Sequence, residues 1–303
     1  MATFADARRE GALEQSQSRY QRVMGALRGL PFIWVFILLV VLIIPGLFAP
    51  IIAPHDPLDG DLTRRLAPPV WDVEGSWEHI LGTDRQGRDQ LSRLIYGSRI
   101  ALFVSMTALL ISATIGTTLG LVSGWYGGWM DHIVQRIVDI KASIPAILLA
   151  LIFVSIFGQS VFVAIAVIAI FLWNRYTRLI RAETLSLRNM DFVARARVSG
   201  CSTPRIIVKH ILPNVANTLI VLATLEVGVV IILESTLSFL GVGIPRPTPA
   251  WGVMVADGRN YLAVAWWVAV IPGLGIFLTV LSLNLFGDWL RDRLDPKLRQ
   301  VQR

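Results

Sequence analysis

The chain has 303 residues, of which 54% are hydrophobic and 16% charged, and its formal net charge is +7. Its mean hydropathy is +0.61, and soluble domains carry about 25% charged residues, so the composition indicates a protein solvated by lipid and excludes disorder, collagen-like repeats and small disulfide scaffolds. A positive charge of this size indicates either nucleic-acid binding or the basic cytoplasmic loops of a membrane protein.

Two uncharged stretches in the first half of the chain predict membrane-spanning helices. Residues 30–52 carry no charge over 23 residues, and about 20 suffice to cross the hydrocarbon core. Five arginines precede this stretch, and Pro50 and Pro54 directly follow its late alanines, so we interpret it as an uncleaved signal anchor rather than a cleaved signal peptide. The second span lies within residues 100–130, after a predicted external loop, residues 53–99, with eight acidic and six basic residues.

The next uncharged stretch, residues 142–174, is too long for one crossing. It would measure about 50 Å as a single helix. A turn near Gly158 divides it into a third span, 133–157, and a fourth, 161–180. Residues 175–213 then hold eight basic and two acidic residues, and the positive-inside rule places them in the cytoplasm only if two spans precede them.

Two further spans, 215–237 and 262–286, complete six helices with both termini in the cytoplasm. The fold class predicted is therefore an all-α integral membrane protein. Most of the basic excess falls on one cytoplasmic loop, so the net charge reports topology and gives no reason to expect nucleic acid as a partner. The predicted organisation is an N-terminal tail 1–29, a first helix with external loop 30–97, a transmembrane domain 98–288 containing a cytoplasmic loop 181–213, and a C-terminal tail 289–303.

The cytoplasmic loop predicts two short helices joined at a glycine. Asp191 is the expected N-cap of the first helix, and Gly200 suits the left-handed position that follows a helix. Thr203 is the expected N-cap of the second helix, with Pro204 at its first position. Pro213 is expected to start the fifth span. From these residues alone, the loop either docks another protein or merely sets topology.

Two carboxylates fall within the fifth span. Glu226 lies near the middle of the membrane and Glu234 near its outer edge, and a separation of eight residues puts them within about 80° on a helix. A charge at this depth is costly unless it meets water or a partner. The two residues either line a translocation pathway, or Glu226 is protonated or bonded to another helix.

Motifs for covalent chemistry or nucleotide binding are missing from the sequence. Cys201 is the single cysteine, and none of the three lysines is followed by Ser or Thr, so there is no Walker A motif. The four histidines never have the i, i+4 spacing of a zinc helix. We expect no catalytic residue, no metal site and no cofactor bound by this chain.

The loop at residues 189–214 resembles the EAA loop of ABC importer permeases. It has the order Ala-x-Ala, three residues, Gly, ten residues, Ile-Leu-Pro, although Ala194 stands in place of the glutamate. In that family the loop forms coupling helices that dock into a groove on the ATPase subunits. The resemblance implies docking residues Asp191, Ala194, Arg195, Ala196, Arg197, Gly200, Pro204, Leu212 and Pro213.

Other motifs resemble the C subunits of dipeptide, oligopeptide and nickel importers. These are HILGTDRQGRDQLSRLIYG at 79–97, LSFLGVG at 237–243, PTPAWG at 247–252 and GDWLRDRLDP at 287–296. The resemblance implies a six-helix type I importer (MetI-like) permease fold in the bacterial inner membrane. It also implies a homologous B-type permease, two ATP-binding subunits that hold ATP and Mg, and an extracytoplasmic solute-binding protein. The substrate stays open among dipeptides, longer peptides, glutathione and nickel chelates.

The first of these motifs carries two interpretations. Its apolar residues share one helical face, which predicts an amphipathic helix on the outer surface. Alternatively, its charged residues contact the binding protein or the partner permease; these are Asp84, Arg88 and Asp89. The rival functions for the whole chain are a secondary transporter or channel working alone, an ABC exporter half and a membrane-anchored scaffold.

Overall fold

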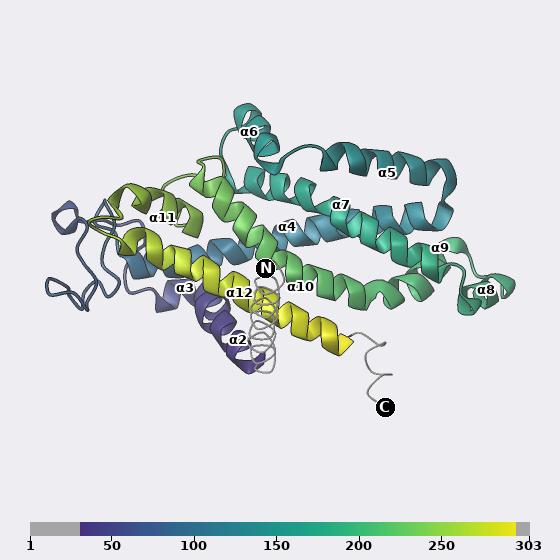
Figure 1. Cartoon of the computed structure of the whole chain (residues 1–303), viewed down its shortest axis with the longest axis horizontal. Helices are drawn as coiled ribbons and strands as arrows, with labels where there is room; N and C mark the ends of the chain where they lie inside the picture. The colour runs from purple at the N-terminus through teal and green to yellow at the C-terminus, as the bar shows by residue number, and fades with distance from the viewer. Residues whose placement is uncertain (1–30, 295–303) are drawn as a thin grey trace, which may run out of the picture.

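The computed structural model describes residues 31–294, so the predicted tail 1–29 and the last nine residues of the predicted tail 289–303 lie outside the described residues. Within that range the chain is mostly helical, and its long helices run side by side along one axis (Figure 1). Five helices are long and apolar enough to cross a membrane, and a bent pair makes a sixth crossing if it counts as one span. The predicted all-α class is confirmed.

The first span contains a π-helical turn. The Ile44 N–H donates to the Leu39 carbonyl, five residues back. The turn ends just before Pro45, whose ring cannot donate to the carbonyl four residues earlier and would collide with it in a regular α-helix. A wider turn therefore lets the helix continue past proline. The three consecutive segments are α2 (Pro31–Leu38), η1 (Leu39–Ile43) and α3 (Ile44–Ile52).

The second span, α4 (Gln90–Tyr126), is 37 residues long, or about 55 Å. It begins ten residues earlier than the sequence predicted because Asp89 caps it, its Oδ2 accepting a 2.7 Å hydrogen bond from the Ser92 N–H. A helix of this length exceeds the roughly 30 Å hydrocarbon core. The motif at residues 79–97, predicted to form an amphipathic helix on the outer surface, is instead the end of a loop followed by the first turns of α4. A short 3₁₀ turn, η2 (Leu62–Arg64), lies earlier in the same loop.

The predicted third span is two helices, α5 (Gly128–Ala142) and α6 (Ala146–Phe157), bent by 86° at the break between them. The bend follows from Pro145, which cannot donate a backbone hydrogen bond and disfavours helical geometry in the residue before it. Ion pairs hold α5 alongside the next long helix: Arg181 binds Asp131 through two contacts of 2.5 and 2.6 Å.

The predicted turn at Gly158 is confirmed, with φ of +75°. It leads into α7 (Val161–Leu187), which lies beside α4 (Figure 1). Three glycines of α4 allow this contact: a Cβ added at Gly116 would lie 2.4 Å from the Trp173 carbonyl oxygen, and Gly120 and Gly124 are similarly close to α7. Small residues at four-residue spacing are typical of closely packed membrane helices.

The predicted start of the fifth span at Pro213 is wrong. The helix runs from Thr203 to Phe239 because a second π-helical turn, ending just before this proline, absorbs it as η1 does at Pro45. The segments of this half of the chain are α8 (Asp191–Val198), α9 (Thr203–Ile206), η3 (Ile207–Ile211), α10 (Leu212–Phe239), α11 (Trp251–Gly258), η4 (Arg259–Tyr261) and α12 (Trp267–Leu294).

Candidate functional site

The turn between α8 and α9 lies at one end of the molecule, and the loop of residues 53–89 lies at the other (Figure 1). Gly200 ends α8 with φ of +76°, as predicted. The Cys201 N–H donates to the Ala196 carbonyl at 3.1 Å and the Gly200 N–H to the Arg197 carbonyl at 3.0 Å. This pair of bonds is a Schellman motif, which satisfies carbonyls that the end of the helix leaves free.

Both predicted N-caps are wrong by one residue. Met190 and Ser202 hold the extended cap conformation, and neither side chain makes a capping hydrogen bond. Asp191 and Thr203 are instead the first helical residues. The carboxylate of Asp191 remains in the first turn of α8, where a negative charge stabilises the helix dipole.

A small apolar cluster holds α8 and α9 against the bundle. Val193, Ala196 and Ile206 are buried together against Trp125, at the end of α4. The Arg197 guanidinium lies over the Trp125 ring, 4.7 Å from its centroid, a distance at which a cation–π interaction is favourable. The predicted docking residue Ala196 therefore faces inward, and its packing connects the turn to α4.

The outer face of the turn exposes most of the predicted docking residues. Val198 is 91% exposed and was missed by the sequence analysis. A large apolar side chain at this level of exposure is typical of a contact surface. We call this group the turn surface; its exposed residues are Ala194, Arg195, Val198, Gly200, Pro204 and Arg205. Of the remaining predicted residues, Asp191, Arg197 and Pro213 are exposed and Leu212 is half-buried.

The two carboxylates of α10 are buried and have different partners. Arg175 of α7 donates from Nη1 to Glu226 Oε1 at 2.8 Å, so Glu226 is bonded to another helix, one of the alternatives the sequence left open. Glu234 accepts a 2.7 Å bond from the Ser238 hydroxyl on its own helix. The structure therefore does not bring Glu226 and Glu234 into one cluster, and a role for them in a pathway stays a prediction.

Three charged residues of the external motif, Asp84, Arg88 and Asp89, are also buried, each less than 5% exposed. Arg88 approaches Asp84 Oδ2 through Nη2 at 2.6 Å, and Arg93 through Nε at 3.5 Å. These side chains hold the loop to the start of α4. Contact with a partner through Asp84, Arg88 and Asp89 stays a prediction. Because these side chains are buried, we expect their substitution to lower the stability of the protein.

Replacing Asp84 with alanine should destabilise the protein by about 3–5 kcal/mol, because it leaves the Arg88 and Arg93 guanidinium groups buried without a counter-charge. Thermal unfolding in detergent measures this loss. Asp72→Ala is the matched control, since Asp72 is exposed in the same loop and should change stability by less than about 0.5 kcal/mol. Equal melting temperatures for the two variants would contradict the prediction.

The surface of the same loop carries two ionised carboxylates. A hydrogen bond from Thr63 lowers the pKa of Asp61 below its usual value. A hydrogen bond from Arg64 lowers the pKa of Glu78 in the same way. Both groups therefore stay negative well below neutral pH.

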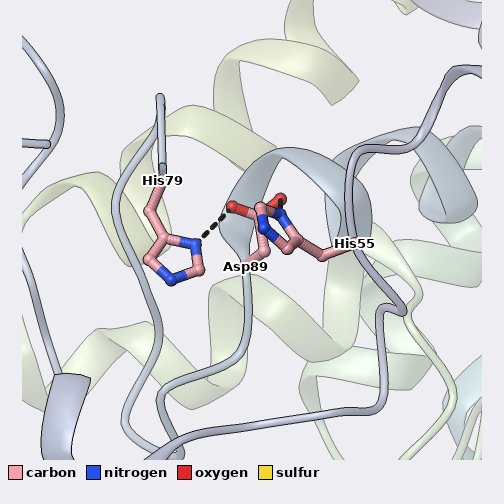
Figure 2. A group of neighbouring side chains, drawn as sticks. All are labelled: His55, His79 and Asp89. Atoms are coloured by element: carbon pink, nitrogen blue, oxygen red, sulfur yellow. Dashed lines mark hydrogen bonds and ion pairs between the residues drawn. The ribbon is translucent and has the colours of Figure 1, made fainter. Parts of the chain in front are cut away.

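The structure also gathers three side chains that the sequence analysis did not connect. His55, His79 and Asp89 each offer a ligand atom, and these atoms lie within 4.8 Å of one another (Figure 2). Histidines that bind zinc from a single helix lie one helical turn apart, whereas these residues come from three separate segments. No local spacing could have revealed them.

Comparison with known proteins places the chain in a family. Residues 116–300 match the model of the binding-protein-dependent transport system inner membrane component. The di/tripeptide transport system permease protein DppC of Pseudomonas aeruginosa is 42% identical over 91% of this chain and 89% of its own length. The dipeptide transport system permease protein DppC of Escherichia coli is 43% identical over 95% of this chain and 94% of its own length.

The chain belongs to this family of transport permeases. A chain of the MetNI methionine ABC transporter, solved in inward-facing conformations, has the same fold, with a TM-score of 0.53 at 18% identity over 66% of this chain and 95% of its own. The predicted permease fold is therefore confirmed, and the permease is a multi-pass inner-membrane protein. The region matched by the family model contains the turn surface and both α10 carboxylates, whereas His55, His79 and Asp84 precede it.

For this permease we expect Glu226→Gln to lower the initial rate of uptake several-fold. Glutamine removes the negative charge that pairs with Arg175 inside the bundle. A hydrogen bond to a charged group contributes about 1.5–3 kcal/mol to the stability of the folded state. Adding Arg175→Gln should restore part of the rate, because the two amides can bond to each other. Initial rates for several peptides in membrane vesicles measure both effects. Wild-type kinetics in Glu226→Gln for every peptide would overturn the prediction.

Proposed function

We propose that this permease is the C-type subunit of an ATP-driven importer of dipeptides and short oligopeptides. The observation that carries the proposal is the identity of 42–43% over more than nine-tenths of the chain with permeases named for dipeptide and tripeptide transport. Likeness of this extent covers the external loop as well as the helical bundle.

The permease itself hydrolyses no ATP in this proposal. Two ATPase subunits hold ATP and Mg, and their groove receives the turn surface at the cytoplasmic end. A homologous B-type permease forms the other half of the pathway, and a solute-binding protein delivers peptide from outside. With the turn surface in the cytoplasm, both chain termini are cytoplasmic as well.

The packing of α8 provides a route for the coupling. Movement of the turn surface reaches α4 through Trp125, which contacts both the buried cluster and Arg197. It also reaches α10 directly, because α9 continues through η3 into that helix. A displacement of the turn therefore acts on two helices of the bundle, which rearrange between outward-open and inward-open states.

The test is uptake of a labelled dipeptide in a bacterial strain that lacks its own peptide permeases. Uptake should require this chain together with its neighbouring-gene partners, and it should stop when the Walker A lysine of either ATPase is replaced. Uptake by this chain alone would overturn the proposal and favour a secondary transporter. Competition by glutathione or a nickel chelate, but not by peptides, would keep the machinery and change the substrate.

A further inference from the structure

Three potential metal ligands meet at the end of the molecule opposite the turn surface. His55 follows the end of α3, His79 lies in the loop of residues 53–89, and Asp89 caps the start of α4 (Figure 2). The carboxylate of Asp89 lies within reach of both rings: its Oδ1 is 3.0 Å from His79 Nδ1, and its Oδ2 is 3.8 Å from His55 Nδ1.

These separations match the geometry of a metal site. Zinc binds imidazole nitrogen and carboxylate oxygen at about 2.0–2.2 Å, so two ligands in a tetrahedral arrangement are about 3.3 Å apart. The two observed distances lie on either side of this value, and no ligand atom is more than 4.8 Å from another. The three ligand atoms are therefore close enough together for one ion to bind them.

The hydrogen bonding of the cluster also indicates a ligand. Within the described part of the chain, the buried Nδ1 atom of His55 has no hydrogen-bond partner. The Asp89 side chain is 2% exposed, that of His79 12% and that of His55 36%. The cluster is therefore enclosed on the Asp89 side and partly open to solvent beside His55, which gives an ion a way in.

The surrounding backbone fixes two of the three ligands. The His55 N–H donates to the Ser92 hydroxyl at 3.0 Å, and the Ser92 N–H donates to Asp89 Oδ2 at 2.7 Å. A single serine thus holds the His55 backbone and the Asp89 carboxylate in place. Fixing ligands in this way lowers the entropy lost when a metal binds.

We propose that His55, His79 and Asp89 form a three-ligand site for a divalent transition metal of the zinc type, completed by water. Two imidazoles and one carboxylate are ligands that zinc accepts in open sites. A bound ion would join the end of α3, the loop and the start of α4, and so stabilise the loop on the outer ends of these helices. The site does not depend on the identity of the transported peptide.

The test is a calorimetric titration of the purified, chelator-treated transporter with Zn²⁺. The absorption spectrum of bound Co²⁺ serves as a second, spectroscopic probe. One Zn²⁺ should bind per permease, and the melting temperature should rise by about 2–4 °C at saturation. His55→Ala and His79→Ala should each weaken binding at least tenfold and remove the thermal shift. Asp89 is left unchanged because it caps α4.

The matched control is His132→Ala, since His132 is exposed in α5 and should leave the affinity unchanged. His55→Gln keeps a polar side chain at a partly exposed position and guards against loss of fold, which size-exclusion chromatography monitors. The proposal fails if wild-type protein binds no Zn²⁺ saturably, which would leave a hydrogen-bonded His–Asp–His cluster. It also fails if the folded variants bind Zn²⁺ as tightly as the wild type.

Discussion

A glutamate at position 198 is expected to lower ATP-driven uptake at least tenfold while leaving the permease folded in the membrane. Val198 is 91% exposed at the end of α8, so a polar side chain there meets no neighbour within the chain. A docked partner would instead cover it, and burying an unpaired carboxylate costs several kcal/mol. A loss of about 1.4 kcal/mol in binding free energy already lowers the affinity for the partner tenfold.

Two measurements test this expectation: the amount of ATPase subunit that copurifies with the permease, and the uptake rate in proteoliposomes. The matched control is Val73→Glu, the same substitution at a valine that is 100% exposed in the loop at the opposite end. We expect copurification to fall for Val198→Glu only. If Val198→Glu copurifies and transports like Val73→Glu, the turn surface is not where the ATPase binds.

The second large effect is expected at the contact between α4 and α7. A methyl group at Gly116 would lie 2.4 Å from the Trp173 carbonyl oxygen and 2.5 Å from the Tyr176 Cβ. The carbonyl belongs to a helix backbone, so the clash can be relieved only if the two helices move apart. Overpacking of this kind costs about 1–3 kcal/mol, and separation of the helices would also loosen the core between them.

Gly116→Ala should therefore lower the melting temperature and the yield of monodisperse protein. Gly273→Ala is the control, because a Cβ at Gly273, in the membrane helix α12, meets nothing within 4 Å. Alanine there should be neutral or stabilising by about 0.5–1 kcal/mol, since it limits the unfolded chain. The melting temperature should therefore fall for Gly116→Ala and stay the same or rise for Gly273→Ala. Equal shifts in the two variants would refute the packing argument.

Features that depend on neighbouring residues were predictable from the sequence. The turn at Gly158 follows from a length limit on one crossing, and the left-handed Gly200 follows from a helix that has to end there. The four-residue spacing of Gly116, Gly120 and Gly124 is typical of close helix packing, although it does not identify α7 as the partner. These predictions rest on local geometry, which the order of residues determines.

The effect of each proline was not predictable in the same way. Pro145 breaks a span and produces an 86° bend, whereas Pro213 lies inside a helix that continues through it. Both lack a backbone N–H, and the difference is whether the preceding turn widens into a π-helix. Packing against other helices decides that, as it decides the pairing of Arg175 with Glu226 and the meeting of His55 with Asp89.

The π-helical turn η3 also determines which sequence positions of α10 face inward. A turn with hydrogen bonds over five residues holds one residue more than an α-helical turn, and each residue corresponds to about 100° around the axis. The inward face of α10 is therefore offset from that of α9 by this extra residue. A chain one residue shorter between Ile207 and Ile211 would close this turn into a regular α-helical one, so the widened turn lets α10 carry an extra residue in sequence while Glu226 keeps its place beside Arg175.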